Sequence, residues 1–277
     1  MHPHFSKSFV KHLLLTLVDS RLQNGAAALA FYSMLAIFPT AIFALSLLPY
    51  LPIPNLQQAI FDLLGELMPR EAAQLFDDTV HKIVSERHSG LLSFGLLFAI
   101  WSAASGVLAT LEQLDLVRGE GPTRSALPAR GLAFLLLIPL SLWVVCTFGV
   151  VIFGGTMQAW IAESLGSSPL LLFSFASFRW LVITLAILAA IAFMYRVGPT
   201  HARPFRLFSP GALFSTFGLM LVSFAFRFYV AEFGNYDAVY GGLGAAIALL
   251  VWLFVAAWMF LMGAALDELL REPEAAL

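Results

Sequence analysis

Charged residues are scarce in this sequence. Only 12% of the 277 residues are Asp, Glu, Lys or Arg, whereas a soluble domain usually carries about a quarter. Hydrophobic residues make up 60% of the chain, and its mean hydropathy is +0.87. Because so few polar groups cannot cover a globular surface, many apolar side chains have to face lipid instead of water. The composition therefore excludes an ordinary water-soluble protein.

Cysteine is almost absent, and the chain carries little net charge. The one cysteine, Cys146, excludes an internal disulfide and a zinc site built on cysteines. It lies in an apolar run, which predicts a small buried hydrophobic residue and not a reactive thiol. The formal net charge of −2 argues against a nucleic-acid partner, which would need a basic face to neutralise phosphates.

Motifs of known catalytic chemistry are also missing. The sequence has no P-loop, no GxSxG elbow and no GxGxxG opening a helix. Its histidines form no metal-ligand motif such as HExxH; they are His2, His4, His12, His81, His88 and His201. Metal-dependent RNA cleavage needs clustered carboxylates or histidines around one or two cations. We therefore predict no metal, no cofactor and no enzyme activity, and we rank a ribonuclease last among the candidate functions.

The sequence does contain long apolar stretches. A spanning helix needs about 20 mostly apolar residues. Six stretches qualify: 25–50, 90–111, 131–154, 176–196, 209–230 and 240–266. They predict an all-α, polytopic bundle of about six spanning helices, forming a single integral membrane domain over 1–277.

Local signals refine these helices. Ser209-Pro210-Gly211 places an N-cap residue and a proline at the start of the fifth span. Pro39 and Pro139 fall inside the first and third spans, where each removes a backbone donor and predicts a kink. Two segments have the pattern of amphipathic interfacial helices, the N-terminus at 4–19 and the first outer loop at 52–89.

Lysine and arginine are distributed unevenly among the connections. With the N-terminus inside, the inner side holds Lys7, Lys11, Arg21, Arg118, Arg124, Arg130, Arg196, Arg203, Arg206 and Arg271. The outer side holds only Arg70, Lys82 and Arg87. This asymmetry predicts a multi-pass protein of a bacterial cytoplasmic membrane with both termini in the cytoplasm.

Two arginines fall within spans, close to their outer ends. A charge at the position of Arg179 or Arg227 is costly unless it snorkels, pairs or lines a wet cavity. Snorkelling to headgroups is one interpretation, and binding an anionic substrate group is the other. Pairing is a third, with acidic candidates Glu163, Glu232 and Asp237.

A glycine-rich segment opens the sixth span. Glycines at a helix start permit close helix packing, an unwound turn or exposed amide donors near a ligand. Packing alone remains the alternative. The resulting set of candidate substrate-binding residues is Arg179, Arg227, Asn235, Tyr236, Asp237, Tyr240, Gly241, Gly242 and Gly244.

Acidic residues follow the second and sixth spans, where basic residues of the inner side could meet them. This predicted polar cluster consists of Arg21, Glu112, Asp115, Arg118, Arg196, Asp267 and Glu268. Ordinary interfacial ion pairs are the competing interpretation, and such pairs contribute little to stability.

Three stretches resemble the YihY/BrkB family of bacterial inner-membrane proteins. The stretches are Ala26 to Pro39, Tyr195-Arg196-Val197-Gly198-Pro199 with Pro210-Gly211-Ala212, and Tyr229 to Trp252 with Tyr240-Gly241-Gly242-Leu243-Gly244-Ala245. The resemblance implies six spans and an inner-membrane location. Asp115 and Val117 stand where members often carry Asn and Tyr, and Gly263-Ala264-Ala265-Leu266-Asp267 replaces a common Gly-Ala-Glu-Leu-Asn ending.

The same resemblance implies location better than activity. The family includes a protein associated with serum resistance, one linked to lipopolysaccharide precursor transport, and an old label of ribonuclease BN. From the spans, the outer arginines and the glycine-rich helix entry we predict a transporter or flippase-like carrier of a lipid-like, amphiphilic anion. The alternative is a non-transporting scaffold for envelope assembly, and an enzyme acting on lipid ranks third. Membrane lipids are the expected partners, with envelope-assembly proteins as further candidates.

Overall fold

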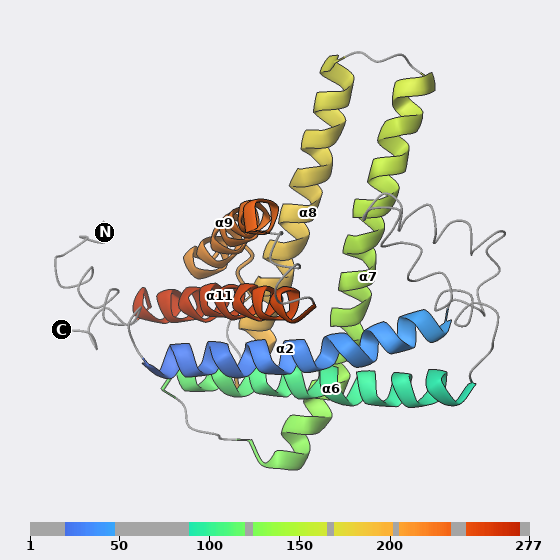
Figure 1. The fold of residues 1–277 in the computed structure, drawn as a ribbon. Coiled ribbons are helices and arrows are strands. Elements are labelled where there is room, and N and C mark those ends of the chain that lie inside the picture. The colour runs from blue at the N-terminus through green and yellow to red at the C-terminus, as the bar shows by residue number, and fades with distance from the viewer. Residues whose placement is uncertain are drawn as a thin grey trace. The chain divides into compact units, whose positions relative to one another are not determined.

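The computed structural model describes residues 20–47, 89–119, 124–164, 169–201, 205–233 and 242–271. All regular structure in these ranges is helical (Figure 1). The helices are α2 (Ser20–Leu47), α6 (Ser89–Val117), α7 (Ala126–Ser164), α8 (Pro169–Val197), α9 (Pro210–Phe233) and α11 (Gly242–Leu269). The predicted all-α class is thereby confirmed.

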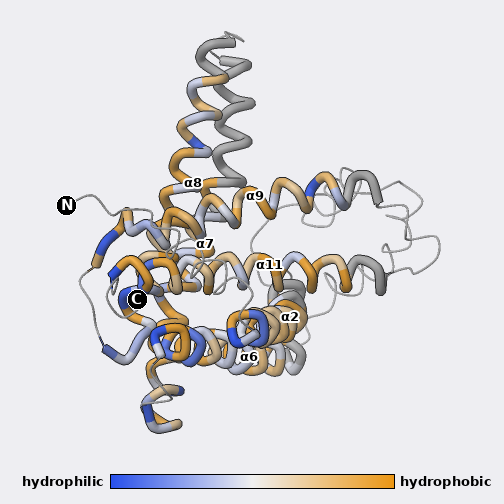
Figure 2. Tube along the Cα trace, turned by 90° about the vertical axis from the view of Figure 1, so that its left-hand side faces the viewer, coloured by the Kyte–Doolittle hydropathy of each residue, from blue (hydrophilic) through white to orange (hydrophobic). Residues whose placement is uncertain are grey.

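Five of these helices are long and apolar enough to cross a membrane. Their spanning portions are Leu92–Val117, Ala126–Thr147, Phe173–Val197, Pro210–Tyr229 and Ala246–Leu269. The first predicted span corresponds to α2, a helix of 28 residues. Hydrophobic residues dominate the described tube in Figure 2. The chain is thus a multi-pass helical membrane protein, in agreement with a prediction of about six spans.

The helices extend beyond the predicted windows. α6 continues past residue 111 to Val117, so Glu112 and Asp115 lie in its last turns and not after it. It ends where Gly119 adopts a φ of +71°, a left-handed conformation that glycine reaches without a steric cost. α7 has 39 residues and a length of about 58 Å, nearly twice a hydrocarbon core. The charged residues Glu112 and Asp115 therefore do not end the helix.

Several predictions made from the sequence are not tested by the structure. The interfacial helix 4–19 lies outside the described residues, and so does the outer loop 52–89 apart from Ser89, the first residue of α6. Pro39 lies inside continuous α2 and Pro139 inside continuous α7, while the kinks predicted there stay predictions.

The chain forms two compact units, which are considered separately; the predicted single domain stays a prediction. One unit is Tyr32–Ala103, and the other combines Met1–Phe31 with Ala104–Leu277. In the first, a Cβ added at Gly95 of α6 would lie 3.1 Å from the backbone nitrogen of Phe43 in α2. In the second, α7 packs along α8, while α9 packs along α11 and crosses α8 at a steep angle (Figures 1 and 2).

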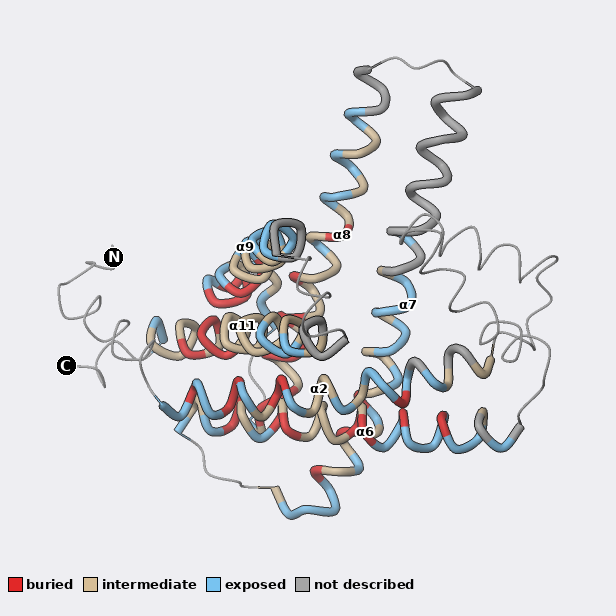
Figure 3. The backbone as a smooth tube through the Cα atoms, in the orientation of Figure 1, coloured by how far each residue is buried: buried red, intermediate tan, exposed pale blue. Residues whose placement is uncertain are grey.

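The core of the larger unit consists of two buried clusters, with residues from α6, α7, α8 and α9. One buried cluster contains Leu114, Leu188, Ile191, Ala192, Tyr195 and Ala212. A second contains Leu111, Ala133, Leu136 and Met194. Figure 3 shows buried residues concentrated at one end of the α9–α11 pair. This end contains the candidate site.

Many large apolar side chains are exposed, as expected for helices that face lipid. Leu142 is 63% exposed, Phe217 66% and Leu221 70%. Cys146 of α7 is exposed as well, so the prediction of a buried cysteine is wrong. The apolar run misled because lipid-facing and core-facing positions of a spanning helix are equally hydrophobic.

Candidate functional site

The carboxyl end of α8 is held by two arginines. Helix ends leave backbone carbonyls without partners inside the helix, and cations complement the negative end of the dipole. Arg118 donates from Nη2 to the carbonyl of Tyr195 over 3.0 Å. Arg124 donates from Nη1 to Gly198 and from Nη2 to Pro199, each over 2.9 Å. Side chains from the segment between α6 and α7 therefore satisfy the carbonyls that end α8.

Asp115 holds the segment that follows α8. Its carboxylate is buried, with 5% of the residue exposed. One oxygen accepts the backbone amide of Thr200 over 2.7 Å, and the other accepts the Thr200 hydroxyl over 2.8 Å. A buried carboxylate requires hydrogen bonds of this kind to offset its lost hydration. Asp115 thus fixes the link between α8 and α9.

The amino end of α9 is capped as the sequence predicts. Ser209 Oγ accepts the amide of Ala212 over 3.1 Å, and the helix begins at Pro210. Asp267 of α11 adds a second cap: its Oδ1 accepts the Gly211 amide over 2.7 Å, and its Oδ2 accepts the Ser209 hydroxyl over 2.6 Å. A carboxylate at this end also complements the positive end of the helix dipole.

Below this cap, α9 and α11 approach each other at two glycines. A Cβ on Gly211 would overlap the carbonyl oxygen of Gly263, and one on Gly263 would overlap the carbonyl oxygen of Gly211. The hydroxyl oxygens of Tyr195 and Ser215 lie 2.8 Å apart beside this contact. Tyr195 donates to the carbonyl of Phe260, so α8 joins the same contact.

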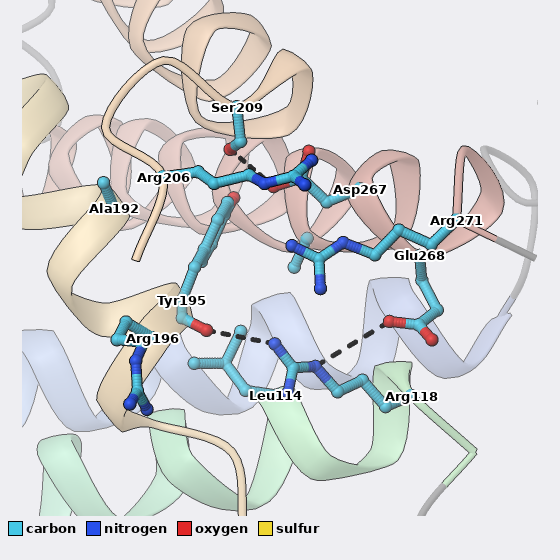
Figure 4. Close-up of a pocket in the computed structure, with 11 residues that line it drawn as sticks. Leu114, Arg118, Ala192, Tyr195, Arg196, Arg206, Ser209, Asp267, Glu268 and Arg271 are labelled. Carbon is cyan, nitrogen blue, oxygen red and sulfur yellow. Dashed lines mark hydrogen bonds and ion pairs between the residues drawn. The ribbon is translucent and has the colours of Figure 1, made fainter. Parts of the chain in front are cut away.

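A small pocket lies above this contact (Figure 4). Four arginines and two carboxylates line it, giving a net charge of 4 − 2 = +2. The space amounts to about 30 Å³, enough for one or two water molecules or a small anionic group. We call it the arginine pocket; its residues are Leu114, Arg118, Ala192, Tyr195, Arg196, Arg206, Ser209, Ala264, Asp267, Glu268 and Arg271.

The two carboxylates are already engaged. Asp267 caps α9, and Glu268 lies 3.9 Å from Arg118 Nε. The guanidinium groups of the other three arginines, Arg196, Arg206 and Arg271, have no hydrogen bond or ion pair to any residue that the structure describes. Figure 4 shows Arg206, Arg271 and Arg118 reaching into the same space from three different segments. The pocket therefore has cationic groups available to an anion.

The structure brings together part of the predicted polar cluster. Arg118, Arg196, Asp267 and Glu268 line the arginine pocket, and Asp115 bonds the link beside it. Glu112 and Arg21 are exposed and are not among the lining residues. Arg206 and Arg271 were not predicted as members of the cluster, although both belong to the excess of basic residues predicted for the inner side. Arg206 lies just before α9 and Arg271 just after α11, and this sequence position could have predicted their place in the cluster.

The predicted outer set is only partly described. Arg179 lies half-buried on α8, and its Nε atom is buried with no hydrogen-bond partner in the described chain. Arg227 is exposed on α9. Gly242 and Gly244 lie in the first turn of α11, while the remaining five positions of the set lie outside the described residues. Neither arginine lines the arginine pocket.

The described part of the chain offers no cluster of residues that commonly bind metals. Among the described residues, no three His, Cys, Asp or Glu side chains lie close enough together to hold a metal ion. The chemistry that the arginine pocket offers is thus binding of an anion through hydrogen bonds and charge.

Comparison with known proteins identifies the relatives of this chain. It is 31% identical to the ribonuclease-like protein YfkH of Bacillus subtilis (strain 168), over 96% of each chain. It is 27% identical to a UPF0761 membrane protein of Xanthomonas campestris pv. campestris (strain 8004), covering 94% of this chain but 60% of that protein. No solved structure matches. Residues 14–276 match the family described as Virulence factor BrkB, and the chain belongs to this family of integral membrane proteins.

Proposed function

We propose that this protein is a carrier, in the bacterial cytoplasmic membrane, for a lipid-like anionic amphiphile. The arginine pocket takes the anionic head group at the cytoplasmic side. The observation that carries the proposal is the charge of the pocket: Arg206 and Arg271, two arginines without described side-chain partners, reach into a space whose two carboxylates are already engaged (Figure 4). The net positive charge of such a site favours binding of an anion.

Arginine suits this role for geometric reasons. Its planar guanidinium binds carboxylate or phosphate oxygens through two parallel hydrogen bonds, which a lysine cannot reproduce. The pocket has room for a small anionic group such as a phosphate but not for an acyl chain. The acyl chain would lie in the lipid around the exposed apolar side chains of the helices. An amphiphile satisfies both conditions, whereas a fully hydrated anion satisfies only the first.

A non-transporting scaffold for envelope-assembly proteins is the second candidate, and one observation favours it. Neither the arginine pocket nor a second cavity between α7 and α8 has Arg179 or Arg227 in its wall. The close backbone contact of Gly211 with Gly263 also favours a closed bundle. Ribonuclease activity, suggested by the name of the Bacillus relative, ranks below both, because the described residues offer no ligand cluster for metal-assisted cleavage.

Neutralising the pocket should weaken lipid binding. In the double variant Arg206→Gln/Arg271→Gln, binding of phosphatidylglycerol at the arginine pocket should weaken about tenfold, as expected when a charged hydrogen bond is lost. Native mass spectrometry of protein incubated with phosphatidylglycerol or phosphatidylcholine measures the retained lipid directly. Phosphatidylcholine retention should not change.

The matched control keeps the charge. Arg206→Lys/Arg271→Lys removes the paired donors but leaves two cations, so it should retain an intermediate amount of phosphatidylglycerol. Equal retention by wild type and the glutamine variant, at equal thermal stability, would refute head-group binding and leave the scaffold ahead.

Orientation makes a separate prediction. In a Cys146→Ser background, cysteines at Ser6 and Thr123 should resist an impermeant maleimide in intact spheroplasts, and a cysteine at Gln74 should react. The physical reason is the excess of Lys and Arg that a cytoplasmic N-terminus places on the inner side. Labelling of Thr123→Cys with protection of Gln74→Cys would show the reverse topology, and the arginine pocket would then face outward.

A further inference from the structure

A second cavity lies between α7 and α8, and it differs from the arginine pocket in size and chemistry. Its volume is about 370 Å³, within the usual range for small-molecule sites. On α7 its lining residues recur at one-face helical spacing: Pro139, Leu142, Trp143, Cys146, Thr147 and Val150. Ile183 and Ala186 close it from α8. We call it the α7–α8 groove.

The groove offers almost no hydrogen bond to an occupant. Trp143 Nε1 donates across it to the Ala186 carbonyl over 3.0 Å. The Thr147 hydroxyl donates to the Trp143 carbonyl of its own helix over 2.8 Å. Because both polar side chains are satisfied inside the protein, the groove can gain free energy only by covering apolar surface. Its occupant should therefore be hydrocarbon.

One unsatisfied cation shares a face of α8 with the groove. Arg179, Ile183 and Ala186 are spaced i, i+4 and i+7, so they lie along one side of the helix. The seven residues from Ala186 to Arg179 correspond to about 10 Å. Long helical side chains lean toward the helix N-terminus, which carries the guanidinium of Arg179 further toward the start of α8. Its buried Nε has no hydrogen-bond partner among the described residues.

We propose that the α7–α8 groove binds one acyl chain of an anionic membrane phospholipid, whose phosphate is bound by Arg179. The two walls belong to helices that are long and apolar enough to span the membrane, so membrane lipid is the surrounding solvent. Hydrocarbon fits the satisfied apolar lining, and the positive charge of the half-buried Arg179 guanidinium attracts a phosphate. This inference rests on the proposed function and adds a second, separate lipid site to it.

Cys146 provides the test, because it is the only cysteine of the chain and lines the groove. Wild-type protein in detergent should react with N-ethylmaleimide about threefold more slowly once phosphatidylglycerol is added, since the bound chain covers the thiol. The matched control is Cys146→Ser/Val145→Cys: Val145 is 67% exposed on the adjacent position of α7, outside the groove lining. Its labelling rate should not depend on the lipid.

Two further variants separate the chain from the head group. Ala186→Phe should fill the groove and remove the lipid protection of Cys146, while Leu185→Phe, which places the same ring at a position outside the lining, should not. Arg179→Gln should abolish the preference for phosphatidylglycerol over phosphatidylcholine, and Arg179→Lys should restore part of it. Equal labelling of wild-type Cys146 with and without lipid overturns the proposal even if a variant fails to fold.

The remaining outcomes identify other occupants. Efficient cross-linking of Cys146 between two chains by a short bis-maleimide would assign the groove to a second copy and overturn the lipid proposal. Protection by phosphatidylcholine as strong as by phosphatidylglycerol would overturn the role of Arg179. The arginine-pocket variant Arg206→Gln/Arg271→Gln should leave Cys146 protection intact, so failure at one site is distinguishable from failure at the other.

Discussion

Replacing Gly263 with alanine is expected to destabilise this protein strongly. The new Cβ would overlap the carbonyl oxygen of Gly211 and the hydroxyl of Ser215, and it would lie 2.8 Å from the Tyr195 hydroxyl. A flexible side chain could give way, but the Gly211 carbonyl is backbone, so α9 itself has to shift. Overpacking of this kind costs about 3 kcal/mol.

Thermal unfolding in detergent would measure this effect. A loss of about 3 kcal/mol corresponds to a fall in Tm of about 6–12 °C for a chain of this class. The matched control is Gly131→Ala in α7, where an added Cβ meets no atom within 4 Å. That substitution should leave Tm unchanged or raise it slightly, since alanine favours helix over glycine. A Tm for Gly263→Ala within one measurement error of wild type would disprove the close contact of α9 with α11.

The helices could be predicted from the sequence because the membrane sets both their length and their composition. A run of about 20 apolar residues rarely occurs outside a spanning helix, and each predicted span has a helix in the structure. The N-cap at Ser209 was predictable for a similarly local reason: the signal lies within four consecutive residues. Helix ends were harder to predict, since α6 continues through Glu112 and Asp115 to Val117.

The junction between α8 and α9 could not be predicted, because its bonds join residues far apart in the chain. Arg118 meets the Tyr195 carbonyl 77 residues later, and Asp267 meets Gly211 across 56 residues. Hydrophobic periodicity does not report such pairs. The sequence pattern also could not separate lipid-facing from core-facing positions, as Cys146 shows. Polar cluster membership was partly foreseeable, since acidic and basic residues gathered at the same predicted ends.

The link between α8 and α9 is tied down at both ends, and the arginine pocket lies against it. Asp115 and Arg124 hold the start of the link, while Asp267 holds the amino end of α9. Asp267 therefore has two roles at once: it stabilises the helix junction, and it places negative charge in a pocket that we propose to bind an anion. These roles predict opposite changes when its charge is removed.

Asp267→Asn should lower stability and raise anion binding. The amide oxygen of Asn can still accept the Gly211 amide, but the charge that favours the helix N-terminus is lost, a cost of about 1 kcal/mol. Asp267→Ala also leaves Gly211 N–H and the Ser209 hydroxyl without this acceptor, so the cost should rise to about 2–3 kcal/mol. Combining Asp267→Ala with Ser209→Ala should be less than additive, because the two residues share one hydrogen bond.

Lipid retention should move the other way. Removing one carboxylate raises the net charge lining the pocket from +2 to +3, so Asp267→Asn should retain about threefold more phosphatidylglycerol than wild type. Phosphatidylcholine retention should stay constant, which separates a charge effect from general loosening of the bundle. A purely structural Asp267 predicts lower or equal retention of both lipids as stability falls. Measuring Tm and both lipids on the same preparations decides between the two, and a parallel fall of all three would count against head-group binding in the arginine pocket.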